Sequence, residues 1–216
     1  MARILTAITQ KIEYWASEVG ILYNLAEKYY VNIVANEAYL AGINQDDHIL
    51  CIGGGLCPFS AILFHQMTKA RVTFIDNNEN CIPKLRRVIE RLGLSSHIDV
   101  FLQDGSNPYI LYADYSVVHL ALQVYPMEQV FTAVENGIIP GTKLLVRQPR
   151  KQLNDVYSKF SNTMLTYCSC AKHESRNVGS TFIYIKQEEA EILYNEKMDS
   201  DDSNYAVTNC PVVVRH

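Results

Sequence analysis

Residues 48–76 read HILCIGGGLCPFSAILFHQMTKARVTFID, and this stretch decides the fold. Its opening apolar run, 48–52, breaks into three glycines, Gly53–Gly55. A segment of helical character follows, and a second apolar run, 72–75, ends at Asp76. Glycine at a strand end lets the backbone turn sharply and approach a ligand without an intervening Cβ. An acid about 20 residues later, at the tip of the next strand, suits a pair of ribose hydroxyls. The stretch therefore predicts a βαβ unit that binds a nucleoside.

Two common nucleotide-binding motifs do not fit the glycines. The dinucleotide fingerprint needs a small residue three positions after its second glycine, and Pro58 stands there. Proline has no N–H and suits the first turn of a helix. The P-loop motif needs Gly-Lys-Ser/Thr, which does not follow these glycines. A glycine turn can also be purely structural, but the order strand, glycines, helix, strand, acid favours a ligand. A nucleoside without a pyrophosphate, such as S-adenosylmethionine, fits best.

Composition indicates a globular protein with one main domain. The chain has 216 residues, 48% hydrophobic and 19% charged, with a net charge of −4. That charge argues against a nucleic-acid surface. No apolar run approaches the ~20 residues of a membrane span, and no signal-peptide pattern is present, so we expect a cytoplasmic protein without a membrane partner.

The six cysteines form no C-x-x-C pair, which favours buried thiols over a metal site. Cys168, Cys170 and His173 follow a C-x-C-x-x-H pattern that is not a usual zinc spacing. Alternation along a strand would place both cysteines on one face of it. We therefore expect no metal.

Alternating strands and helices follow a helical N-terminal segment. Apolar residues repeat at helical spacing over 9–41, and Gly20 is expected to bend or break this helix. Beyond it the pattern alternates, which predicts a doubly wound parallel sheet. The expected strands are 48–52, 71–75, 98–103, 115–121 and 142–147, and the expected helices are 58–68, 79–92, 126–137 and 152–162.

The alternation ends in two strand-like runs, 164–171 and 180–186, with no room for a helix between them. Five parallel strands followed by an antiparallel hairpin resemble the layout of class I S-adenosylmethionine-dependent methyltransferases. We therefore predict an α/β fold: a doubly wound, mainly parallel seven-stranded sheet with a short N-terminal helical appendage.

Three segments are expected along the chain. Residues 1–44 form the N-terminal helical segment, 45–187 the Rossmann-like domain that binds S-adenosylmethionine, and 188–216 an acidic tail. Over 187–204 the chain has seven acidic residues and one lysine, typical of a solvated segment. The closing CPVVVRH, 210–216, is expected to add an edge strand or to reach a second copy of the chain, which makes a homodimer one possibility.

Ligands of open α/β sheets bind at the carboxyl ends of the strands, near the switch point in strand order. The glycine turn would accommodate the methionine and ribose portion of the ligand. Asp76 would accept both ribose hydroxyls, and Asp104 would accept from the adenine amino group. The alternative for Asp104 is a helix N-cap, because Asp-Gly-Ser-Asn is also turn chemistry. The strand ends that converge there supply Gly53, Gly54, Gly55, Asp76, Asn77, Asp104, Gly105, Leu120 and Gln123.

Three motifs resemble those of the nicotianamine synthases. GGGLCPFSAIL, 53–63, is similar to GSGPLPLTSIxL and matches it at Gly53, Gly55, Pro58 and Ile62, with Ser60 for Thr. YSVVHLALQV…GIIPGTKLLVRQPR, within 115–150, is similar to YDVVFLAALV…PGALLVVRS and includes Arg147. YYVN, 29–32, with Glu37 shortly after, resembles YYxNY…E. The resemblance covers about residues 29–150.

This resemblance implies transfer of the 3-amino-3-carboxypropyl group of S-adenosylmethionine to a small amine or amino acid. Glu37 would orient or deprotonate the amine, and Tyr30 would hydrogen-bond the amine or the donor carboxylate. Arg147 would bind a substrate carboxylate, with a structural salt bridge as its alternative, and Gln123 would also contact the substrate.

Departures from the motifs keep two other functions open. Leu56-Cys57 replaces Pro-Leu, and the chain has a shorter N-terminal helical part than the family. A small-molecule methyltransferase is the first alternative. A nucleoside-binding protein without turnover is the second, because 120–124, LALQV, lacks an Asn-Pro-Pro-Tyr-type tetrapeptide.

Overall fold

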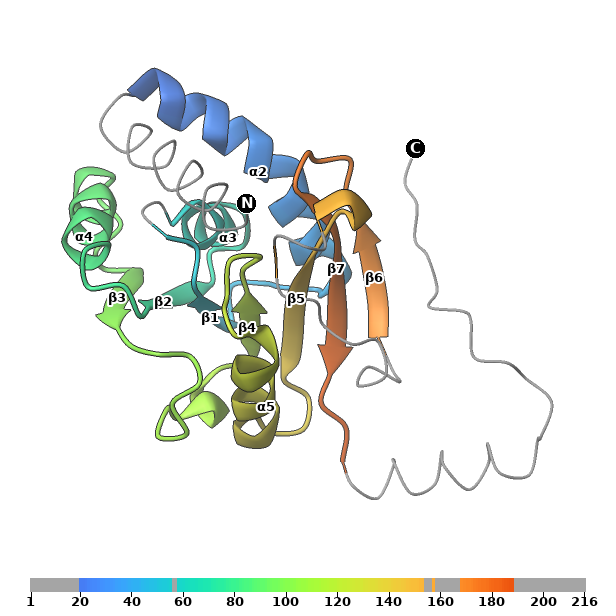
Figure 1. Cartoon of the computed structure of the whole chain (residues 1–216). Coiled ribbons are helices and arrows are strands. Elements are labelled where there is room, and N and C mark those ends of the chain that lie inside the picture. Colours follow the sequence, from blue (N-terminus) through green and yellow to red (C-terminus); the bar gives the residue numbers. More distant parts are fainter. Residues whose placement is uncertain (1–19, 56–57, 154–156, 158–167, 189–216) are drawn as a thin grey trace, which may run out of the picture.

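A seven-stranded sheet forms the centre of the protein (Figure 1). The computed structural model describes residues 20–55, 58–153, 157 and 168–188. The strands are β1 His48–Ile52, β2 Arg71–Asp76, β3 Ile98–Leu102, β4 Val117–Leu120, β5 Lys143–Pro149, β6 Cys168–Lys172 and β7 Val178–Ile185. Their order across the sheet is β3-β2-β1-β4-β5-β7-β6. The strand order reverses between β1 and β4, which is the switch point.

The first five strands are parallel and the last two form an antiparallel hairpin. Parallel pairs join β3 to β2, β2 to β1, β1 to β4 and β4 to β5. The final strand, β7, lies between β5 and β6 and is antiparallel to both. All four residues of β4 are buried, as expected for a parallel strand covered on both faces. The predicted doubly wound, mainly parallel seven-stranded sheet is confirmed.

Helices cover both faces of the sheet (Figure 1). The helices are α2 Gly20–Leu40, α3 Phe59–Thr68, α4 Ile82–Arg91 and α5 Met127–Gly137, with short 3-10 turns η1 Tyr112–Asp114 and η2 Lys151–Leu153. Side chains of α2, α3 and α4 share one apolar core with β1 and β2. Those of α5 and η1 share another core with β1, β4 and β5. The two cores hold the strand ends of the switch point in place.

Several element boundaries differ from the sequence-based expectation. β4 is shorter than the predicted strand 115–121, and at its start the Tyr115 amide still donates to Tyr112 of η1. β7 begins earlier, at Val178. The residues before Gly20 lie outside the described ones, so the bend expected at Gly20 stays a prediction. Most of the expected helix 152–162 and the acidic tail beyond 188 also lie outside the described residues. Within the described ranges, no helix is both long and apolar enough to cross a membrane.

Candidate functional site

The glycine turn lies between β1 and α3, at the switch point. Gly53, Gly54 and Gly55 have φ angles of +72°, +125° and +71°, a region that L side chains rarely adopt. A Cβ on Gly53 would lie 2.9 Å from Cγ2 of Val124. Three glycines are therefore required for the chain to turn here. The next helix begins directly after Pro58, whose carbonyl accepts from the Ile62 amide.

Asp76 ends β2 beside the glycine turn. Its Oδ2 accepts a hydrogen bond from the Gly55 amide at 3.2 Å, and its Oδ1 accepts from the Asn78 amide at 2.9 Å. Burial raises the pKa of Asp76, and the two amide hydrogen bonds oppose that rise. A carboxylate has about four acceptor positions, so both oxygens keep room for a further donor such as a sugar hydroxyl.

Asp104 and Gly105 form a turn after β3. Oδ1 of Asp104 accepts from both the amide and the hydroxyl of Ser106, each at 2.8 Å. These hydrogen bonds lower the pKa of Asp104, and the Asn77 side chain also contributes. No described helix begins at Asp104, so this residue is not the helix N-cap considered as its alternative. Its carboxylate instead accepts hydrogen bonds within the turn. A Cβ on Gly105 would lie 2.5 Å from Cγ2 of Ile52, which explains the glycine.

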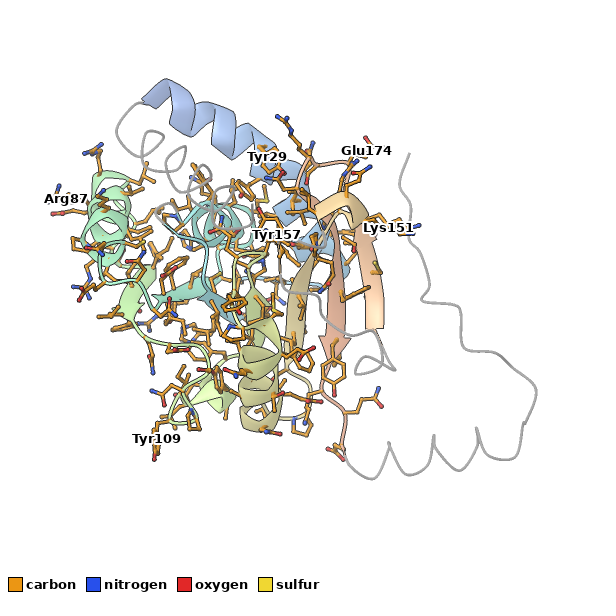
Figure 2. All side chains as sticks on the ribbon, in the orientation of Figure 1. Tyr29, Arg87, Tyr109, Lys151, Tyr157 and Glu174 are labelled. Atoms are coloured by element: carbon orange, nitrogen blue, oxygen red, sulfur yellow. The ribbon has the colours of Figure 1, made fainter. Side chains whose placement is uncertain are left out.

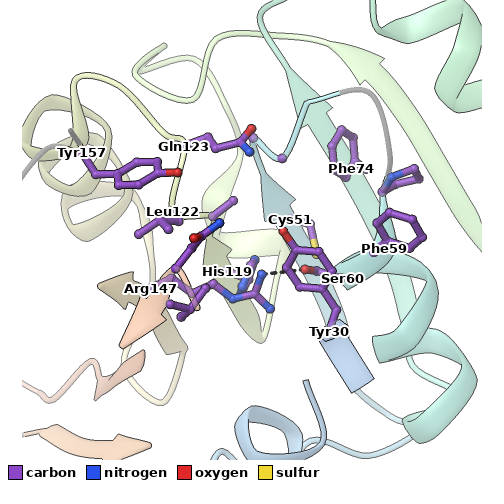
Figure 3. A pocket seen from close by; sticks show the side chains of 16 residues that line it. Tyr30, Cys51, Phe59, Ser60, Phe74, His119, Leu122, Gln123, Arg147 and Tyr157 are labelled. Carbon is purple, nitrogen blue, oxygen red and sulfur yellow. Dashed lines mark hydrogen bonds between the residues drawn. The ribbon is translucent and has the colours of Figure 1, made fainter. Parts of the chain in front are cut away.

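A pocket opens on the other side of the glycine turn (Figure 3). Its empty space, counted with the solvent at its mouth, is about 580 Å³. Of the predicted site residues, Gly53, Gly54, Tyr30, Gln123 and Arg147 line it. The remaining lining residues are Cys51, Pro58, Phe59, Ser60, Phe74, His119, Ala121, Leu122, Tyr157, Asn177 and Val178.

A buried ion pair joins α2 to the sheet at this pocket. The Nε and Nη2 atoms of Arg147 donate to Oε1 and Oε2 of Glu37, each at 2.8 Å. Glu37 is fully buried and Arg147 nearly so. Burial by itself raises the pKa of Glu37, but the charge and hydrogen bonds of Arg147 outweigh it and lower the pKa to about 2. Both groups are therefore charged at neutral pH.

The register of β5 and β7 extends this pair into a network. Arg147 pairs with Thr181 across the two strands, so both side chains lie on one face. Thr181 donates its only hydroxyl hydrogen to Oε1 of Glu37 at 2.6 Å. Its contact with His173 Nε2, at 2.9 Å, must then be accepted by the hydroxyl, so Nε2 of His173 carries the proton. On the opposite side, Nη1 of Arg147 donates to Oγ of Ser60 at 2.8 Å, the dashed line in Figure 3.

This geometry changes the expected role of Glu37. Its side chain is behind Arg147 and outside the pocket lining, and both oxygens accept from Arg147. A carboxylate with a pKa of about 2 is a weak base, so the arrangement does not favour direct proton abstraction. Arg147 has five N–H bonds, three of which are donated to described residues, so within the described part of the protein two remain for a ligand. The structural salt bridge considered for Arg147 is present, and the guanidinium still lines the pocket.

Tyr30 and Leu120 differ sharply in position. The Tyr30 ring stacks on Phe59 at 5.8 Å between centroids, and Cζ of Arg147 lies 5.6 Å from the centre of the Tyr30 ring. Tyr30 is therefore part of the pocket wall. Leu120 is fully buried in the apolar core, and the residues that follow it, Ala121 to Gln123, line the pocket instead.

The hairpin supplies a wall that the sequence analysis did not include. Asn177, in the turn between β6 and β7, and Val178, the first residue of β7, line the pocket. The Tyr29 hydroxyl holds this turn by donating to Ser175 Oγ at 3.1 Å and accepting from the Asn177 amide at 3.0 Å; Figure 2 shows Tyr29 beside the turn. His119 was also missed, because a single histidine within an apolar strand gives no signal of its own. Only the tertiary structure shows that His119 lines the pocket and lies close to Glu37.

No metal-binding cluster of three or more His, Cys, Asp or Glu side chains occurs among the described residues. Of the C-x-C-x-x-H pattern, Cys170 is buried in β6 and His173 bonds Thr181, while the side chain of Cys168 lies outside the description.

Neither a protein-family model nor a curated protein sequence matches the chain. Solved structures do match. A structure of MtNAS, a nicotianamine synthase, in complex with MTA and tNA has a TM-score of 0.70 at 19% identity and covers 86% of this chain and 74% of its own. The chain has the class I S-adenosylmethionine-dependent methyltransferase fold.

Two further structures with this fold differ in their reactions. An RNA methyltransferase from Salinibacter ruber, in complex with S-adenosyl-L-homocysteine, has a TM-score of 0.55 at 15% identity and covers 73% of this chain and 92% of its own. An O-methyltransferase from Thermotoga maritima has a TM-score of 0.59 at 10% identity, with 73% and 66% coverage. At these identities the likeness shows the shared fold and leaves the reaction open.

Proposed function

We propose that the protein is an S-adenosylmethionine-dependent transferase that transfers the 3-amino-3-carboxypropyl group to a small amine or amino acid. The observation that carries this proposal is the position of Asp76, which is hydrogen-bonded to Gly55 across a glycine turn that forms one wall of the pocket. The fold is that of enzymes using this donor. Two of the motifs similar to nicotianamine synthases supply residues that line the pocket, Gly53 and Arg147.

The donor would lie along the carboxyl ends of β1, β2 and β3. The glycine turn, where a Cβ on Gly53 would meet Val124, gives the donor close access to the backbone. Asp76 would accept from the ribose hydroxyls, and Asp104, held by Ser106 and Asn77, would accept from the adenine amino group. The turn at Gly105 would lie next to the adenine ring of the donor. The sulfonium of the donor makes each attached carbon electrophilic, so no nucleophile from the protein is required.

The acceptor would occupy the pocket between α2 and the hairpin. Two N–H bonds of Arg147 would bind a carboxylate of the donor or of an amino acid acceptor. Gln123, which lines the pocket from the loop after β4, would contact the acceptor. The Tyr30 hydroxyl would hydrogen-bond the amine or the donor carboxylate. Glu37 would act through Arg147, because the two hydrogen bonds that Arg147 donates to Glu37 fix the guanidinium plane. Together these residues would position an amine for in-line attack, which is the main requirement of this reaction.

Product analysis tests the proposal. The protein is incubated with S-adenosylmethionine and a mixture of amino acids and primary amines, and the released nucleoside is identified by mass spectrometry. Methylthioadenosine is the expected product. S-adenosylhomocysteine would instead identify a methyltransferase, and calorimetric binding of the donor without release of either nucleoside would identify a binding protein. A protein that fails to bind the donor would contradict all three.

A further inference from the structure

His119 is a buried polar side chain without a hydrogen-bond partner in the described part of the protein. It lies on β4, is 1% exposed, and lines the pocket. Neither Nδ1 nor Nε2 has a partner among the described residues. Buried polar groups are nearly always hydrogen-bonded, because leaving one unpaired is unfavourable. An imidazole in this state at a pocket wall points to a ligand that completes its hydrogen bonds.

Charged and titratable groups surround His119 from three elements. Oε2 of Glu37, on α2, lies 3.8 Å from Nε2 of His119, beyond hydrogen-bond distance. Cys51 is the register partner of His119 on β1, and Arg147 lies beside the ring in Figure 3. From α3, Phe64 packs edge-on at 5.4 Å between ring centroids. Burial and the Arg147 charge lower the pKa of His119 to about 3, so the imidazole is neutral and has one N–H donor and one acceptor nitrogen.

The groups around His119 have no net charge. Arg147 is neutralised by Glu37 through two hydrogen bonds. Burial raises the pKa of the Cys51 thiol to about 12, so this side chain is uncharged as well. Such surroundings offer no unpaired negative charge that would stabilise an ammonium ion beside His119. They suit an uncharged group that donates a hydrogen bond, and an uncharged amine is also the form that can attack a carbon.

We propose that His119 determines acceptor specificity by accepting a hydrogen bond from the N–H of an uncharged amine bound in the pocket. This inference rests on the proposed transferase function. One N–H of the amine is bound by the acceptor nitrogen of His119, which leaves the amine lone pair available for the donor carbon. The same contact discriminates against tertiary amines, which have no N–H in their uncharged form, and against thioethers.

Two variants and a matched control test this in turnover. His119→Phe keeps an aromatic ring against Phe64 and removes both nitrogens, whereas His119→Gln keeps an acceptor. His97→Phe makes the same chemical change at an exposed position. With S-adenosylmethionine and propylamine as probes, His119→Phe should raise the KM for the amine about 10-fold, the scale of one hydrogen bond. His119→Gln should recover part of that loss, and His97→Phe should match wild type. Donor affinity, measured by calorimetry, should change less than 2-fold in all three.

A second measurement needs no turnover. In protein labelled with 15N-histidine and saturated with S-adenosylhomocysteine, which has no group to transfer, propylamine should shift the acceptor-nitrogen resonance of His119. Trimethylamine should leave it unchanged. An absent shift with propylamine, or an equal shift with both amines, would overturn the assignment of His119 whatever the turnover result. A propylamine-specific shift in a protein that releases no nucleoside would keep His119 as an amine contact and reject the transferase function instead.

Discussion

The glycine turn with its neighbouring acids and the ion pair at the pocket are built from different kinds of contact. At the glycine turn, Asp76 bonds residues 2 and 21 positions away, and Asp104 bonds Ser106, 2 positions away. At the ion pair, Glu37 bonds Arg147 and Thr181 across 110 and 144 positions. The first region is assembled within one βαβ unit and the turn after it. The second exists only when α2, β5 and β7 have come together.

This difference predicts which substitutions change donor affinity and which change the free energy of unfolding. Asp104 lies at an exposed rim, and Asp76 ends a strand beside the turn, where each has acceptor positions left for a ligand. Glu37 and Arg147 are buried and use their hydrogen bonds mainly on each other. Changes at the acids of the first region should therefore act on donor affinity. Changes at the ion pair should act first on the free energy of unfolding.

The largest effect is expected from breaking the ion pair on one side only. Arg147→Met should lower the free energy of unfolding by about 3–5 kcal/mol, because it leaves Glu37 buried without its partner. The double variant Glu37→Gln/Arg147→Met should be more stable than Arg147→Met alone, since it removes both charges. Urea unfolding at pH 7 measures both. A double variant no more stable than the single one would contradict the view that the pair is electrostatically coupled.

The contribution of Glu37 to the free energy of unfolding should be lost at acidic pH, within a defined pH range. The pKa of Glu37 is lowered from 4.5 to about 2 in the folded protein, so its stabilisation is complete above about pH 4.5 and is lost as the pH falls towards 2. The loss should be on the order of 3 kcal/mol. Unfolding free energies of wild type and Glu37→Gln, measured from pH 7 to pH 2, should converge within this window. A difference that stays constant down to pH 2 would show that Glu37 has an ordinary pKa.

Asp76→Ala should weaken S-adenosylmethionine binding by about 1.5–3 kcal/mol, the scale for hydrogen bonds to a charged group. Titration calorimetry measures this directly. Asp99→Ala is the matched control, because Asp99 lies on the neighbouring strand β3 and pairs at 2.9 Å with Arg71 on the protein surface. Equal donor affinity in the two variants would remove Asp76 from the binding site.

Asp104→Ala should have the smallest effect, about a fivefold loss of donor affinity, because its carboxylate is exposed and solvent competes for the contact. Ser106→Ala provides the control, since it removes one hydrogen bond to Asp104 but keeps the carboxylate. If both variants lose affinity equally, the turn geometry is responsible and Asp104 does not contact adenine.

The positions of the strands followed largely from sequence patterns, and so did the glycine turn. Gly53 to Gly55, the apolar runs and Asp76 lie within 29 residues, 48–76, and local rules link each to the next. Asp104 was expected at the strand tip and lies there in a turn. Leu120 shows the limit of such reasoning. A shift of one or two residues at a strand end moves a side chain from the pocket into the core.

By itself the sequence determined the doubly wound sheet and the glycine turn with its neighbouring acid. Both depend on local features, namely the spacing of apolar residues along each element and the backbone conformations open to glycine. Only the tertiary structure decided that Arg147 pairs with Glu37, that Thr181 and His173 join them, and that His119 is left without a partner among the described residues. Partners more than 100 positions apart are chosen by strand order and register, and the charge, pKa and free hydrogen-bonding capacity of a buried group depend on those partners.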